Sequence, residues 1–196
     1  MKRKLYTILT VLMIVMLTTS PALARGAIKL SGATFSLGSL ISNGFASGLG
    51  NTDWVLVMDA SGHAGITCTN NGGNDVPGQS YPHVDGSGVS TLSGNDPLRK
   101  NGKSPYTVTA KSEFEETQYI PWDEGGCPNS SWTARIDFVY WDSATINVYD
   151  PSDTGFSSPV ATYEFQCVTT YTGPNSTAST FDDGTVSCTQ TYPTKK

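Results

Sequence analysis

The chain has 196 residues, of which only 15% are charged, and its formal net charge is −5. Proteins that bind the phosphates of nucleic acid need clustered Lys and Arg, so this acidic balance excludes nucleic acid as an expected partner. The low charge content, together with abundant Gly, Ser, Thr and Asn, is typical of extracellular β proteins with many turns.

Residues 1–24 have the three-part layout of a secretory signal peptide. Basic residues at the start precede an apolar run over residues 5–17, and Ala22 and Ala24 are the small residues before the cut. A membrane anchor is the alternative, but this run is shorter than the roughly 20 residues that cross a bilayer. We therefore expect residues 25–196 to form one secreted domain with no membrane attachment. Its net charge is −8, because the leader removes three basic residues and no acidic ones.

Strand patterns begin soon after the predicted cut. Residues 25–50 predict two short, weakly specified strands at a sheet edge, because Gly and Ser interrupt their apolar pattern. Residues 54–60 predict a firmer strand, which turns at Ser61-Gly62 and returns as a second strand over residues 63–69.

Two segments are predicted to be irregular. Residues 70–79 are too rich in Gly, Asn and Pro for regular structure, and residues 113–131 form a long loop. Between them, residues 84–92 predict a strand, and an Asn-Gly turn at 101–102 precedes another strand over residues 106–110.

The clearest regular pattern covers Trp132–Tyr149. Every second residue from Trp132 to Tyr140 is apolar, which predicts one buried face. The alternation breaks at residues 142–144 and then resumes, so we expect an antiparallel hairpin. With this parity, Trp141 and Tyr149 fall on the face opposite the core.

Two last strands are predicted over residues 160–168 and 185–191, and no stretch shows helical periodicity. About eight to ten short strands separated by turn signals favour an all-β fold. We expect a single antiparallel β-sandwich, immunoglobulin-like or similar, and a closed barrel is the alternative.

The four cysteines all lie in the exported part of the chain: Cys68, Cys127, Cys167 and Cys188. An even number of cysteines in an oxidising compartment predicts disulfides, with three connectivities open. None has a neighbour at the close spacing of a zinc site, so we expect no metal and no cofactor.

Several loop motifs resemble those of uncharacterised small secreted bacterial proteins. The motifs are Cys68-Thr69-Asn70-Asn71-Gly72-Gly73-Asn74 with Pro77-Gly78-Gln79, then Lys100-Asn101-Gly102, then Cys127-Pro128-Asn129 before Trp132-Thr133-Ala134, and the resemblance covers residues 30–190. It implies a secreted all-β domain and brings no known activity. Val76 stands where these relatives usually have Ala. Because some of them have only the first two cysteines, the resemblance implies that Cys68 pairs with Cys127, which leaves Cys167 for Cys188.

Catalytic residues are not predicted. His63 and His83 are the only histidines, and neither has a ligand at zinc spacing or a nucleophile motif nearby, so we expect structural roles for both. The acidic residues of the loop 113–131 are expected to be solvated. A pair of them across a cleft would support the alternative, a small extracellular hydrolase that acts on a polysaccharide.

Aromatic residues give the leading functional hypothesis. Tyr119 and Trp122 lie in the long loop, and Trp141 points away from the predicted core, so these three are the candidate ligand-binding residues. The alternative, that Trp141 and Tyr149 pack under a loop or a second sheet, stays open. We expect a non-enzymatic extracellular binding, surface or structural module, whose partner is an extracellular carbohydrate or a surface protein.

Overall fold

The computed structural model describes residues 28–37, 39–98, 102–115, 117–171 and 184–192, and the predicted signal peptide lies outside these residues. The described residues form ten strands: β1 (Lys29–Ser36), β2 (Leu40–Ser47), β3 (Trp54–Asn70), β4 (Asp75–Pro77), β5 (His83–Leu92), β6 (Lys103–Ser112), β7 (Tyr119–Ile120), β8 (Trp132–Tyr149), β9 (Ala161–Tyr171) and β10 (Gly184–Tyr192). Within this described part, no helix is long and apolar enough to cross a membrane.

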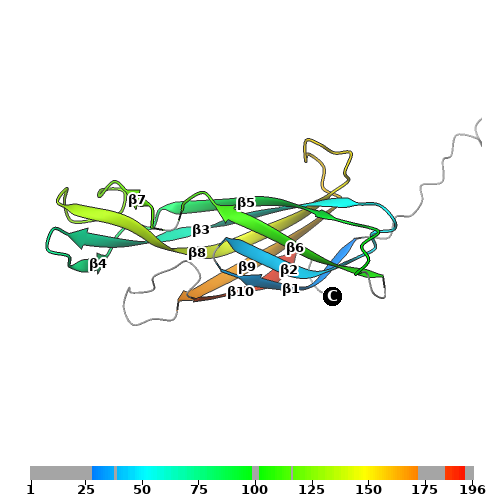
Figure 1. Cartoon of the computed structure of the whole chain (residues 1–196), viewed down its shortest axis with the longest axis horizontal. Helices are drawn as coiled ribbons and strands as arrows, with labels where there is room; N and C mark the ends of the chain where they lie inside the picture. The colour runs from blue at the N-terminus through cyan, green and yellow to red at the C-terminus, as the bar shows by residue number, and fades with distance from the viewer. Residues whose placement is uncertain (1–27, 38, 99–101, 116, 172–183, 193–196) are drawn as a thin grey trace, which may run out of the picture.

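The strands form one antiparallel sheet in the order β1-β2-β6-β5-β3-β8-β9-β10, with β4 added beside β3 and β7 beside β8. The sheet curls until its first and last strands come close to each other, so the body of the molecule is nearly closed and barrel-like. Figure 1 shows that β3 and β8 extend past β1, β2 and β6 to the end where β4 and β7 lie. We call this extension, residues 63–82 and 117–141, the arm.

The core of the body lies inside the curled sheet. Alternate residues of the two long strands point inward there, including Leu56 and Met58 on β3 and Ile146 and Val148 on β8, all fully buried. Tyr163 of β9 helps to close the seam: its hydroxyl accepts a hydrogen bond from the Leu30 amide and donates one to the Ile28 carbonyl. Side chains, rather than a ladder of backbone bonds, therefore join β1 to the far side of the sheet.

The two predicted hairpins are wrong, because β3 and β8 are each one continuous strand. They pair with each other over almost their whole length, from Val55 opposite Tyr149 to Asn70 opposite Trp132. The register shifts twice, and at each shift β8 carries one extra residue, Asp137 or Asp142. The break in the alternation after Trp141 is thus a β-bulge, which inserts a residue without reversing the chain.

The all-β prediction is confirmed, but the two-sheet, immunoglobulin-like form of it is not, because the strands belong to one continuous curled sheet. The strands expected near residues 84–92, 106–110, 160–168 and 185–191 are present as β5, β6, β9 and β10. Short strands β4 and β7 form inside the two segments predicted to be irregular. Each is only two or three residues long and pairs with a long strand, β4 with β3 and β7 with β8.

Both disulfide pairings are confirmed. Cys68 is bonded to Cys127, 59 residues later, and Cys167 is bonded to Cys188 directly across the β9–β10 pair. The first bridge ties the loop before β8 to the buried face of the arm. There, Gly125 packs against Ala134, and both Gly78 and Gly125 lie close to Ile66. The loops thus cover the same face of the arm that the core covers in the body.

Candidate functional site

The two bulges in β8 turn a short segment of the strand over. Before Asp137, Ala134 and Ile136 point toward the buried face; between the bulges, Val139 and Trp141 point there instead, with 1% and 0% exposure. The side chains of Phe138 and Tyr140 are consequently on the outer face. Since side chains alternate along a strand, one extra residue reverses the parity and a second one restores it.

Five aromatic side chains meet on this outer face, and we call them the aromatic row: Tyr81, His63, Tyr140, Phe138 and Tyr171. The imidazole of His63 stacks on the ring of Tyr140 at 5.0 Å between centroids and 9° between planes. Tyr81 meets His63 edge-on at 5.8 Å, and Tyr171 meets Tyr140 edge-on at 5.1 Å. The row therefore crosses the sheet, from the segment before β5 over β3 and β8 to β9.

The backbone beneath the row makes room for it. A Cβ atom on Gly65 would lie 2.9 Å from Phe138 Cδ2 and 2.9 Å from Tyr140 Cε2, so only glycine fits below these two rings. Tyr171 is held by its hydroxyl, which accepts a hydrogen bond from the Val139 amide and donates one to the Val139 carbonyl. These contacts hold the rings of Phe138, Tyr140 and Tyr171 in place.

Exposure differs along the row. Tyr81 is 68% exposed and the His63 side chain 36%, whereas Phe138 is 9% exposed. Burial, together with the neighbouring Tyr81, raises the pKa of Tyr140 above its ordinary value. A tyrosine hydroxyl is neutral at physiological pH even without this shift, so the Tyr140 hydroxyl is able to donate a hydrogen bond.

Each bulge residue is an aspartate that makes an ion pair or hydrogen bond beside the row. Asp142 Oδ2 lies 2.9 Å from Nδ1 of His63. Asp137 is 4% exposed and accepts hydrogen bonds from the Arg135 guanidinium at 2.6 and 3.3 Å. The bond to Asp137 is also the main reason why the pKa of Arg135 is raised. A bulge sited next to a functional surface often re-aims side chains in this way.

The three aromatic residues predicted from the sequence are not brought together. Tyr119 and Trp122 are exposed, as expected, and Tyr119 lies beside Arg135 on β8. Trp141 is completely buried in the core, as the alternative that it is packed allowed; the face assigned to it is wrong, because the Asp137 bulge reverses the parity on which that assignment was based. Tyr149 is buried too, where its ring packs against Phe156 of the following loop.

Sequence analysis missed the row and assigned its histidine a structural role. His63 and His83 are directly opposite each other on β3 and β5, and each is hydrogen bonded to an aspartate, Asp142 and Asp85. The sequence does contain one indication of the bulges: the apolar run Phe138-Val139-Tyr140-Trp141 lies between two aspartates, Asp137 and Asp142. Four consecutive large apolar residues cannot all fit one face of a regular strand.

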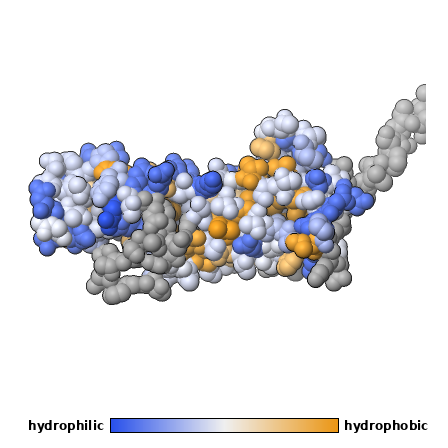
Figure 2. Space-filling model, viewed as in Figure 1, coloured by the Kyte–Doolittle hydropathy of each residue, from blue (hydrophilic) through white to orange (hydrophobic). Residues whose placement is uncertain are grey.

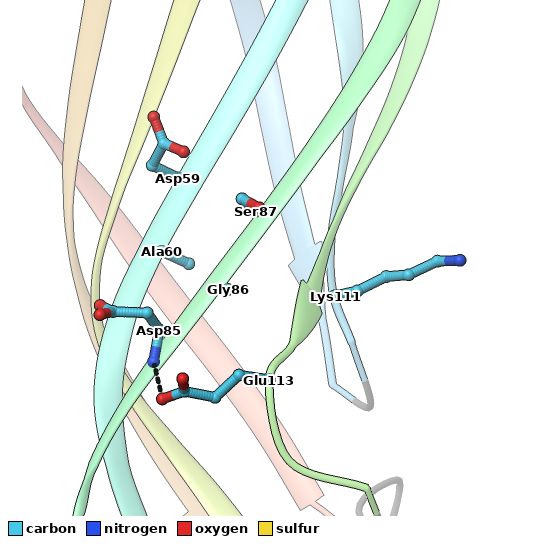
Figure 3. A pocket seen from close by; sticks show the side chains of 7 residues that line it. All are labelled: Asp59, Ala60, Asp85, Gly86, Ser87, Lys111 and Glu113. Carbon is cyan, nitrogen blue, oxygen red and sulfur yellow. Dashed lines mark hydrogen bonds between the residues drawn. The ribbon is translucent and has the colours of Figure 1, made fainter.

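A shallow pocket of about 430 Å³ lies next to the row on the side of the body. This carboxylate pocket is lined by Asp59, Ala60, Asp85, Gly86, Ser87, Lys111 and Glu113. Figure 3 shows that the Glu113 carboxylate reaches the backbone amide of Asp85, at 3.1 Å, whereas the Lys111 side chain points away from the carboxylates. Among the described residues, no group of three or more His, Cys, Asp or Glu side chains is arranged to hold a metal ion.

Hydrophobic side chains also reach the surface elsewhere. Phe45 on β2, Val89 on β5 and Val168 on β9 are each at least half exposed, but they lie on three different strands. Figure 2 shows more hydrophobic surface over the body than at the end of the arm, which is mainly hydrophilic. Single exposed apolar residues are ordinary in soluble proteins, whereas the row is a contiguous set of rings in contact.

Comparison of the chain with known proteins found no matching family model, no matching curated protein and no matching solved structure.

Proposed function

We propose that the protein is an exported binding module and that it presents the aromatic row to an extracellular glycan. The observation that carries this proposal is the pair of bulges in β8. They place Phe138 and Tyr140 on the outer face, where these rings join His63, Tyr81 and Tyr171. A regular strand through the same sequence would leave both rings on the buried face.

Aromatic side chains suit this task for two physical reasons. The flat, exposed ring of Tyr81 can pack against the apolar face of a pyranose ring, and the tyrosines add hydroxyls that bond to sugar hydroxyls. Tyrosine also loses little conformational entropy when it is fixed, because only two side-chain angles are involved. Tyr140 and Tyr171 are already held by ring contacts and hydrogen bonds, so ligand binding orders few further groups.

Export is proposed from the leader sequence, and the two disulfides agree with an oxidising compartment outside the cytoplasm. The resemblance to small secreted bacterial proteins is part of the same proposal. An immunoglobulin-like sandwich also stays a proposal as the fold family.

A polysaccharide hydrolase is the second candidate, and the carboxylate pocket is the observation that favours it. Its carboxylates line one depression, as a glycosidase requires. However, Asp85 is already bonded to His83, and Glu113 to the backbone amide of Asp85. We therefore rank binding above catalysis.

Removal of single rings tests the proposal. A glycan array identifies the ligand, and calorimetry then compares Tyr81→Ala and Tyr140→Ala with Tyr119→Ala and Trp122→Ala. Loss of a central ring of the row is expected to weaken binding by about tenfold or more, as for aromatic anchors in other interfaces. Tyr119→Ala and Trp122→Ala change exposed aromatics outside the row and are expected to leave the affinity nearly unchanged.

If instead only Tyr119→Ala and Trp122→Ala lose binding, the binding site lies in the loop of residues 113–131 and not in the aromatic row. Release of reducing ends from a polysaccharide by the wild-type protein, abolished by Glu113→Gln, would instead support the hydrolase.

A further inference from the structure

One carboxylate oxygen at the edge of the aromatic row has no hydrogen-bond partner among the described residues. Asp142 is bonded to His63 Nδ1 through Oδ2, which leaves its Oδ1 without a partner there. A carboxylate oxygen is an acceptor, and the His63 ring that contacts Asp142 also meets the exposed ring of Tyr81 edge-on. An acceptor in this position suits a ligand that has hydroxyl groups to donate.

The charges around the row are mainly negative. Asp142 is about half exposed at one side, and Asp85 is exposed near the neighbouring histidine at the other, next to the carboxylate pocket. The positive charge of Arg135 is already paired with the buried Asp137, and Lys111 points away. An anionic ligand would meet like charges here, and this repulsion weakens as salt screens it.

A cationic ligand fits the charge but not the shape. Aromatic sites for cations surround the charge with the faces of several rings. In the row, His63 stacks on Tyr140, and Tyr171 packs edge-on against the same ring. Only His63 and Tyr140 stack face to face, so the rings do not surround one point with their faces, and Tyr81 is the most exposed ring of the row.

We propose that the ligand is an uncharged saccharide and that Asp142, held in place by His63, is its specificity determinant: the carboxylate accepts a hydrogen bond from a sugar hydroxyl while Tyr81 packs on the sugar ring. This inference rests on the proposed function, since it names the ligand class for the same site. It goes further in predicting which sugars are rejected: those that carry carboxylate or sulfate groups.

An array of three oligosaccharide classes tests the inference: neutral hexose oligomers, uronic acid oligomers, and hexosamine oligomers with free amino groups. The wild-type protein is expected to bind a neutral oligomer at least about tenfold better than its uronic acid counterpart at low salt, with a smaller ratio at high salt. Asp142→Asn keeps the shape and removes the charge, so it is expected to weaken neutral binding about tenfold and to narrow the discrimination against uronic acids.

Asp96→Asn is the matched control. It removes the same charge at a turn near the opposite end of β5, where Asp96 accepts a hydrogen bond from the Leu98 amide. It is expected to leave binding unchanged. His63→Gln is the second variant, should Asp142→Asn fold poorly. It keeps a donor toward Asp142 but removes the imidazole ring that stacks on Tyr140 and contacts Tyr81, so it is expected to weaken neutral binding as well.

The possible outcomes distinguish a failure of the neutral-saccharide inference from a failure of the glycan-binding function. The inference is overturned if the wild-type protein prefers uronic acids or amino sugars. It is also overturned if Asp142→Asn binds neutral oligomers as well as Asp96→Asn does. In both cases the glycan-binding function stands. If the wild-type protein binds no oligosaccharide, or if Tyr81→Ala and Tyr140→Ala bind as well as the wild type, the proposed function itself fails.

Discussion

Gly65 is the residue on which the packing of the aromatic row depends most directly. It lies on the outer face of β3 opposite Phe138, and it is buried although it has no side chain, because two rings lie over it. Glycine within a strand costs conformational entropy and packs nothing itself, so its presence here points to a close approach by neighbouring groups.

Gly65→Ala is expected to lower the free energy of unfolding by about 1 to 3 kcal/mol, because the new methyl group overpacks the rings of Phe138 and Tyr140. It should also change the near-ultraviolet circular dichroism, which reports on fixed aromatic rings. Urea unfolding measures the first effect. Gly155→Ala is the control, since its Cβ would have a single neighbour, at 4.0 Å. Equal stability and equal dichroism in the two variants would show that the rings are not tightly packed on Gly65.

At the scale of the strand, the bulges explain what the sequence could predict and what it could not. Alternation identified β5, β6, β9 and β10, because these strands keep one register with their neighbours through most of their length. The alternation pattern gave a wrong prediction, a hairpin, where β8 gains a residue, because a bulge and a turn both appear in the sequence as a break in the alternation. The long pairing of β3 with β8 distinguishes the two cases, and that contact is not visible in either segment alone. Trp141 was misplaced for this reason, and Tyr140 was overlooked.

The Asp137 bulge is expected to depend on its ion pair with Arg135. Asp137 is almost fully buried and accepts two hydrogen bonds from the guanidinium, which is itself partly exposed. A double-mutant cycle of Asp137→Asn and Arg135→Gln should give a coupling free energy of about 1 to 3 kcal/mol, the range for charge-assisted hydrogen bonds. The cycle uses urea unfolding of the four proteins. A coupling within experimental error of zero would mean that backbone pairing alone maintains the bulge.

At the scale of the whole molecule, buried tyrosines make stability depend on alkaline pH. Burial raises the pKa of Tyr106 and of Tyr163 above the ordinary value. Above about pH 10 the unfolded chain loses these protons while the folded chain retains them. The unfolded state then binds fewer protons, so the free energy of unfolding falls as pH rises, by up to about 1.4 kcal/mol per pH unit for each tyrosine.

The loss of stability is expected only above about pH 10, since below that pH both states keep the tyrosine protons. Urea unfolding at a series of pH values measures it. Tyr163→Phe should show a shallower decline, although it starts from a lower stability, because the Leu30 amide loses its acceptor. A decline of the same steepness in this variant would assign the alkaline transition to other groups.

The body and the arm each have one disulfide, and this division leads to the last prediction. The chain-entropy model gives about 4 kcal/mol for the Cys68–Cys127 loop and about 3 kcal/mol for the Cys167–Cys188 loop. Because the first bridge fastens the covering loops to the arm, the double variant Cys68→Ser/Cys127→Ser is expected to lose amide protection locally, in residues 64–78 and 119–136, before the body opens.

The double variant Cys167→Ser/Cys188→Ser should instead reduce amide protection in β9 and β10 and weaken the seam beside β1. Hydrogen exchange read by mass spectrometry distinguishes these patterns, and a uniform loss of protection in the first variant would mean that arm and body unfold as one unit. In that case the aromatic row, which lies where the arm meets the body, would be held by the whole sheet rather than by the loops that Cys127 anchors.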